Sequence, residues 1–125
     1  MSCRLLILVC ASFLVGCATS GGKNAADASL KIRRGMSYDQ VISVASSFEV
    51  ERTFRGRGTA LQYCSTDEWN TVGSYVVVWM VDDEVEGLTQ YSGRLPTIYS
   101  NCQRYFREID WGQAPADVKI KLDID

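Results

Sequence analysis

The heptapeptide YVVVWMV, residues 75–81, has the strongest tendency of any stretch in the chain to form a β-strand, because β-branched and aromatic residues dominate it. Successive side chains of a strand point to opposite faces of a sheet. One face would carry Tyr75, Val77, Trp79 and Val81, and the other would carry Val76, Val78 and Met80. Both faces are apolar, so we expect Trp79 and Met80 to be buried on opposite sides of a sheet that is covered on both faces.

Neighbouring segments supply the rest of an antiparallel sheet. Residues 82–84 (DDE) predict a tight turn, and residues 85–91 (VEGLTQY) return as the hairpin partner. Residues 59–64 (TALQYC) predict another strand, and residues 67–74 predict the loop that joins it to the central strand. Residues 118–124 (VKIKLDI) alternate between apolar and charged side chains, which predicts a further strand with one face in water.

The sequence before these strands contains signals for the start of a helix. Ser37 and Gln40 have the spacing of a capping box, in which each side chain bonds the backbone N–H of the other residue. Met36 and Val41 stand where a hydrophobic staple would hold the entering chain against the helix. These signals predict a helix over residues 38–46.

The segment before this helix predicts another short one. Gly35 suits the end of a helix over residues 27–34, with Leu30 as its main apolar contact. The expected fold class is therefore α+β, with two short N-terminal helices on a three- to four-stranded antiparallel sheet. The second apolar face of the sheet still needs a cover, which is either the C-terminal extension from about residue 93 or a partner protein.

The first residues of the chain are typical of an export signal. After Arg4, residues 5–15 (LLILVCASFLV) form an apolar run that is too short to span a bilayer as a helix, which takes about 20 residues. Residues 14–17 (LVGC) follow at once, and they resemble the lipobox of bacterial lipoproteins. The resemblance implies that residues 1–16 are a signal peptide and that Cys17 becomes the lipidated first residue. An ordinary signal peptide with a cysteine by chance is the disfavoured alternative.

The resemblance also implies a place for the protein. Many lipoproteins kept at the inner membrane have Asp directly after the lipidated cysteine, whereas this chain has Ala18. We therefore expect a lipid anchor in the outer membrane and a domain that faces the periplasm, with the inner membrane and the cell surface as alternatives. Residues 17–28 are small and polar and predict a flexible tether, followed by one domain over residues 29–125. The covalent lipid on Cys17 is the only attached group that we expect, and we expect no cofactor.

Cleavage before Cys17 leaves two cysteines without lipid, Cys64 and Cys102. Exported proteins meet an oxidising compartment, so we expect these two residues to form a disulfide. Such a bridge would fasten the C-terminal extension to the sheet. The alternative is two buried free thiols that pack as small apolar groups.

Residues 30–41 (LKIRRGMSYDQV) are similar to the KIxxGMTxxQV segment of small outer-membrane lipoproteins of the BamE/SmpA type. That resemblance implies two N-terminal helices packed on a three-stranded antiparallel sheet. The order of the elements predicted between residues 28 and 91 is compatible with it. Residues 93–125 are an extension beyond this module.

Several function classes are disfavoured by the sequence. The chain has no histidine, which removes the usual Ser-His-Asp and Cys-His catalytic sites and histidine-ligated zinc. It has no CxxC or GxSxG motif, so we expect neither an enzyme nor a metal site. Its net charge of −2 argues against a nucleic-acid partner.

Two charged segments and the aromatic residues have alternative interpretations. Arg52, Arg55 and Arg57 predict a mobile basic loop, which we interpret as a solvated connector rather than a phosphate or headgroup site. The acidic residues between 82 and 86 predict a solvated turn rather than a cation site, because they lack the spacing of a calcium loop. The aromatic residues of the second half suit protein recognition and burial equally: Trp69, Tyr99, Tyr105, Phe106 and Trp111.

Together these features predict a non-catalytic lipoprotein of the outer membrane that acts as a protein-interaction module, as an accessory of outer-membrane assembly or of envelope maintenance. The partners expected are the membrane, through the lipid, and an envelope protein. The alternative is a periplasmic ligand-binding or enzyme-inhibitory module on the same scaffold.

Overall fold

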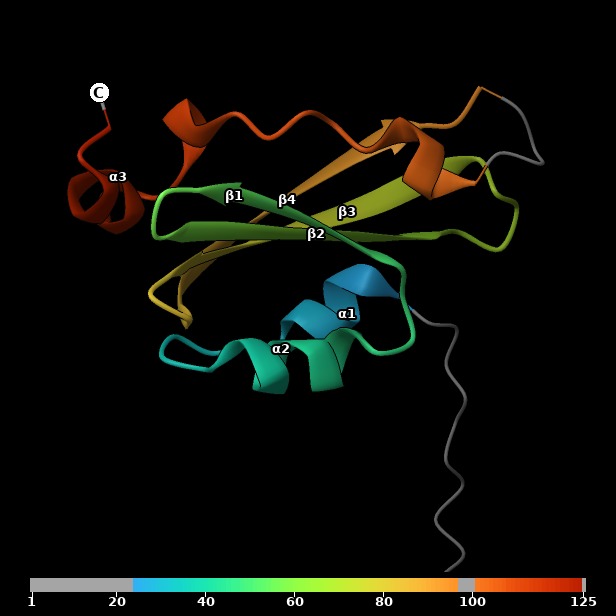
Figure 1. Ribbon diagram of the computed structural model, residues 1–125. Coiled ribbons are helices and arrows are strands. Elements are labelled where there is room, and N and C mark those ends of the chain that lie inside the picture. The colour runs from blue at the N-terminus through green and yellow to red at the C-terminus, as the bar shows by residue number, and fades with distance from the viewer. Residues whose placement is uncertain (1–23, 97–100, 125) are drawn as a thin grey trace, which may run out of the picture.

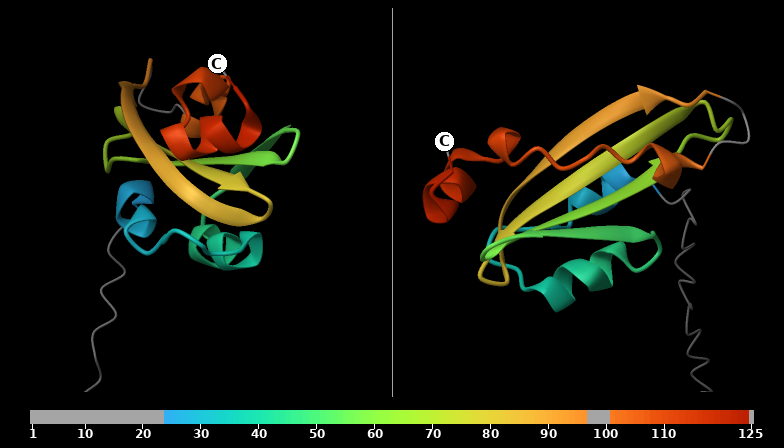
Figure 2. Two further views of the ribbon diagram at one scale, coloured as in Figure 1. Left: turned by 90° about the vertical axis from the view of Figure 1, so that its left-hand side faces the viewer. Right: turned by 45° about the horizontal axis from the view of Figure 1, so that its top comes forward.

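The computed structural model describes residues 24–96 and 101–124. They form an α+β domain in which a four-stranded antiparallel sheet lies between two N-terminal helices and a C-terminal segment (Figures 1 and 2). The strands lie in the order β1 (Val50–Arg55), β2 (Gly58–Thr66), β3 (Val72–Val81) and β4 (Glu84–Arg94). The predicted signal peptide and Cys17 lie outside the described residues.

Strand β3 is buried on both faces, as its sequence predicts. Met80 packs in the cluster beneath the two N-terminal helices, and Trp79 packs in the cluster under the C-terminal segment. The tight turn is also confirmed, because Asp82 and Asp83 both have positive φ angles, 50° and 65°. Two left-handed residues in a row match the right-handed twist of the strands that they join. Strand β3 begins at Val72, so the loop before it is shorter than predicted.

Helix α2 (Tyr38–Ala45) begins at the capping box that the sequence predicts. The Gln40 amide donates to Ser37 Oγ at 3.3 Å, and the Ser37 amide donates to Gln40 Oε1 at 2.9 Å. Met36 and Val41 both belong to the cluster between the helices and the sheet. The helix therefore enters the domain with its apolar face already turned to the sheet.

The folded part begins earlier than predicted. Helix α1 spans Ala25–Ser29, Asn24 caps it, and Ala25 is fully buried with its amide bonded to Ser65 Oγ at 2.7 Å. The predicted tether is therefore wrong over residues 25–28. The prediction for Leu30 is also wrong: its side chain is exposed, and Ile32 makes the buried contact.

Strand β1 replaces the mobile basic loop that the arginines predict. It pairs along its whole length with β2, from Val50 opposite Tyr63 to Arg55 opposite Gly58. Gly56, at a φ of 56°, helps the chain to turn within two residues. The sequence hid this strand because most of its side chains are exposed, so no apolar alternation marks it.

The C-terminal segment covers the second face of the sheet, and the strand predicted over residues 118–124 is wrong. The segment forms the short 3₁₀ helices η1 (Cys102–Tyr105) and η2 (Trp111–Gln113) and the helix α3 (Ala116–Leu122). Trp111 meets Trp79 edge to face, with ring centroids 5.4 Å apart. Helix α3 crosses Gly58 so closely that a β-carbon there would lie 2.5 Å from the side chain of Leu122.

The helix buries different residues than a strand would. Val118 is fully buried and Leu122 packs four residues later on the same helix face, whereas Ile120 is 76% exposed. A strand would instead place Val118 and Ile120 on one face. Val118→Ala should therefore lower the free energy of unfolding by about 2 kcal/mol, through lost packing and a cavity.

The matched variant Ile120→Ala should change that free energy by less than about 0.5 kcal/mol, because it alters an exposed side chain. Urea denaturation of the two variants measures both values. Equal losses would contradict helix α3.

Candidate functional site

The outer edge of β1 carries an exposed surface made by Tyr38, Arg52 and Phe54, which we call the β1 surface. The guanidinium carbon of Arg52 lies 4.1 Å from the ring centroid of Tyr38 and 4.5 Å from that of Phe54. Phe54 remains 61% exposed. Among the described residues, β1 pairs only with β2, so its other edge is open.

This arrangement suits recognition of another protein. Arginine and aromatic side chains are enriched among the residues that contribute most to protein interfaces. Arg52 is already held between two rings, so its side chain loses less freedom when a partner binds. An open strand edge also offers backbone N–H and C=O groups to an added strand. Sequence reasoning identified Arg52 only as a charge, because Tyr38 comes from helix α2.

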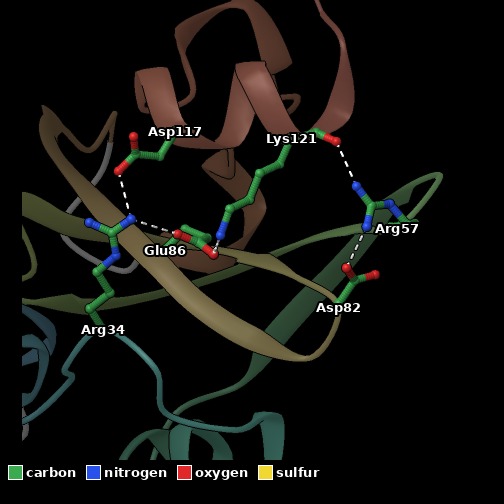
Figure 3. A network of polar contacts seen from close by, with 6 residues as sticks. All are labelled: Arg34, Arg57, Asp82, Glu86, Asp117 and Lys121. Carbon is green, nitrogen blue, oxygen red and sulfur yellow. Dashed lines mark hydrogen bonds and ion pairs between the residues drawn. The ribbon is translucent and has the colours of Figure 1, made fainter.

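A network of charges joins the three layers around the start of β4 (Figure 3). The Glu86 side chain is only 4% exposed and accepts from Arg34 at 3.0 Å and from Lys121. Arg34 also reaches Asp117 at 2.7 Å. The segment between α1 and α2 is thereby tied to β4 and to α3.

The acidic residues between 82 and 86 therefore have separate roles. Glu86 does not belong to a solvated turn, as predicted, but to this network. Asp82, which is exposed at the turn, pairs with Arg57 at 2.5 Å, and Arg57 also donates to the Lys121 carbonyl at 2.7 Å. Arg57 is thus a link between the β1–β2 turn and α3 rather than part of a solvated connector.

The network lowers the pKa of Glu86 below its ordinary value of 4.5, chiefly because Lys121 donates a hydrogen bond to the carboxylate, with Arg34 adding to the effect against the cost of burial. A lowered pKa in the folded state stabilises the fold above the unfolded-state pKa, and this contribution disappears as the pH falls through the folded-state pKa. Glu86→Gln should therefore be less stable than the wild type at pH 7.

We expect the difference in unfolding free energy between Glu86→Gln and the wild type to shrink as the pH falls below about 4.5. Chemical denaturation at a series of pH values measures it. Glu84→Gln, at the exposed neighbouring position, is the matched control and should follow the wild type. A difference that stays constant with pH would contradict the role of the carboxylate charge.

The two cysteines without a predicted lipid meet at the opposite end of the sheet from α3. Cys64 lies on β2 and Cys102 begins η1, and the two residues form a disulfide with their Cα atoms 6.2 Å apart. Tyr75 reinforces this attachment, because its hydroxyl donates to the Cys102 carbonyl at 2.9 Å. Tyr75 also stacks on Tyr91 with ring centroids 4.5 Å apart.

The bridge encloses a segment with a sequence separation of 38. In the chain-entropy account, a loop of that length stabilises the fold by about 4 kcal/mol at most. We expect reduction to lower the denaturation midpoint, and we expect alkylation of mature protein, denatured without reductant, to find no free thiol at either position. Two alkylated cysteines would contradict the bridge. A Cys64→Ser/Cys102→Ser double variant should match the reduced protein in stability.

A buried polar group fixes the middle of the C-terminal segment. Gln62 on β2 is fully buried; its side-chain amide donates to the Arg107 carbonyl at 2.9 Å and its side-chain oxygen accepts from the Tyr91 hydroxyl. The Arg107 amide donates to the same hydroxyl at 3.1 Å. Burial raises the pKa of Tyr91, so its hydroxyl keeps the proton that this relay requires.

A small cavity opens beside these residues, between the sheet and the C-terminal segment. Its volume is about 210 Å³, and its walls include Gln62, Trp79, Thr89, Tyr91, Arg107 and Gln113. Cavities that hold typical organic ligands start at about 300 Å³. In addition, the side-chain nitrogen and oxygen of Gln62 already form hydrogen bonds to Arg107 and Tyr91.

Some of the aromatic residues singled out in the sequence are buried, and others are exposed and available for protein recognition. Trp111 is buried against the sheet and Phe106 packs beside the disulfide, whereas Tyr105 is partly exposed. Trp69 is largely exposed on the loop between β2 and β3. Tyr99 lies outside the described residues.

Within residues 24–96 and 101–124, no group of three or more histidine, cysteine, aspartate or glutamate residues is arranged to hold a metal ion. In the same part of the chain, no helix combines the length and apolar character that crossing a membrane requires. When the chain was compared with protein-family models, curated proteins and solved structures, none of them matched it.

Proposed function

We propose that the protein is a non-catalytic lipoprotein, anchored in the outer membrane through Cys17, that uses the β1 surface to bind an envelope protein. The export signal and the LVGC sequence at residues 14–17 support the anchor. The combination of a lipid anchor and one folded domain suits a module that works while it is tethered to a membrane.

The observation that carries the proposed binding function is the β1 surface itself. An arginine stacked against two aromatic rings, beside an open strand edge, fits a protein partner. The cavity of about 210 Å³ favours the ligand-binding alternative less, because its main polar group is already bonded within the fold.

The similarity of residues 30–41 to small outer-membrane lipoproteins of the BamE/SmpA type supports a more specific proposal. This segment joins α1 to α2 and ends in the capped start of α2. We therefore propose a role as an accessory of outer-membrane assembly or of envelope maintenance. An inhibitor of a periplasmic enzyme remains the second candidate, because an enzyme could also be the partner that the β1 surface binds.

The test is site-specific photo-crosslinking in intact cells. A photoreactive residue in place of Phe54 should give one discrete adduct with an envelope protein. The same residue in place of Ile120, which is at least as exposed but lies on α3, should not. Arg52→Ala should weaken the Phe54 adduct. Equal adducts at both positions, or none at Phe54, would contradict binding through the β1 surface.

The anchor is checked in the same cells by labelling with radioactive palmitate. The wild type should incorporate label, and Cys17→Ala should not incorporate it and should accumulate as a precursor. Undiminished labelling of Cys17→Ala would refute the lipid anchor while leaving the β1 surface to the crosslinking result.

A further inference from the structure

Trp69 is the largest apolar side chain that the described residues leave in water. It lies on the loop between β2 and β3 and is 75% exposed, whereas Trp79 and Trp111 are buried in the core. A tryptophan that the fold does not bury suggests a contact with something outside the domain.

The loop that carries Trp69 is held by its own hydrogen bonds. The Asp67 carboxylate accepts from the Thr71 amide and the Thr71 hydroxyl, each at 2.6 Å, and from the Val72 amide at 3.0 Å. Asn70 takes a left-handed conformation and bonds to Thr66 at 2.8 Å. The same bonds to Thr71 and Val72 lower the pKa of Asp67, so it stays ionised. The indole of Trp69 therefore lies on a loop whose conformation is held by its own hydrogen bonds.

This loop lies at the end of the domain where the described chain begins. Asn24 shares the walls of one surface cavity with Asp67, Glu68 and Val72. The amide of the next residue, Ala25, bonds to Ser65 on the strand that leads into the loop. Helix α3 lies at the opposite end of the sheet (Figure 1 and the right-hand view of Figure 2).

The proposed lipid anchor limits how far this end can move from a membrane. Cys17 and Asn24 are seven residues apart, and a fully extended chain of that length spans at most about 25 Å. We propose that the Trp69 loop rests in the headgroup layer of the phospholipid membrane that holds the anchor. This inference rests on the proposed anchoring through Cys17.

The chemistry of the loop fits that layer. Tryptophan favours the membrane–water interface, where its ring leaves water and its N–H keeps polar partners. Asp67 and Glu68 directly precede it in the sequence, and their negative charges are repelled by an anionic surface. A zwitterionic phospholipid surface is therefore the one that we expect Trp69 to enter. The contact would orient the domain with α3 away from the membrane.

The test uses the intact lipidated protein in vesicles of phosphatidylcholine that contain chain-brominated phosphatidylcholine. The signal of Trp69 is the difference in emission between the wild type and Trp69→Phe. We expect bromine to quench this signal, and we expect its emission maximum to shift to shorter wavelength on reconstitution. The matched control is Trp69→Phe/Ile120→Trp, which moves the reporter to an equally exposed position on α3 and should not be quenched.

Each outcome decides the proposal. Quenching at position 69 and not at position 120 supports it. An unquenched Trp69, or equal quenching at both positions, overturns it even when palmitate labelling shows that Cys17 carries lipid. A protein without palmitate on Cys17 overturns the anchor and this inference together, so the two failures are distinguishable.

Discussion

Strand β3 cannot leave either of its faces in water, and the architecture follows from that constraint. Its side chains alternate between two apolar clusters, one with Met80 under helices α1 and α2 and one with Trp79 under the C-terminal segment. A four-stranded sheet with one bare apolar face would expose a patch that soluble domains rarely tolerate. The third layer is therefore a part of the fold and not an appendage to it.

That third layer is thin, so apolar contact alone does not hold it. Its elements are two short 3₁₀ helices and one short helix, which have little stability of their own. It is fastened at three places along the sheet: by the Cys64–Cys102 bridge, by Gln62, and by Glu86 with Lys121. Gln62 and Glu86 are polar groups that would be costly to bury without these partners, and the bridge is covalent. Their spacing from one end of the sheet to the other fixes the direction of the segment.

The two edges of the sheet differ, and the difference bears on function. The start of β4 is covered, because the Gly35 amide bonds to the Val85 carbonyl at 2.8 Å and the Val85 amide bonds to the Met36 carbonyl at 2.9 Å. Strand β1 has no such cover among the described residues, and its exposed Phe54 lies near Arg52 and Tyr38 of α2. A partner that adds to the sheet would therefore meet β1, while the proposed membrane contact lies at one end of the strands. The two surfaces can be used at the same time.

The amino-acid sequence by itself determined the features that depend on neighbours in the chain. These are the central strand with two buried faces, the turn at Asp82 and Asp83, and the capped start of α2 at Ser37. Only the tertiary structure decided the features made by distant residues. The alternation of residues 118–124 fits a strand, yet packing of Val118 and Leu122 across Gly58 selects a helix. Arg34 meets Asp117 across a sequence separation of 83, and Arg52 finds its rings on another element, so neither contact has a local signal. Local patterns report the free energy of nearby groups, whereas these contacts arise only once the layers have packed.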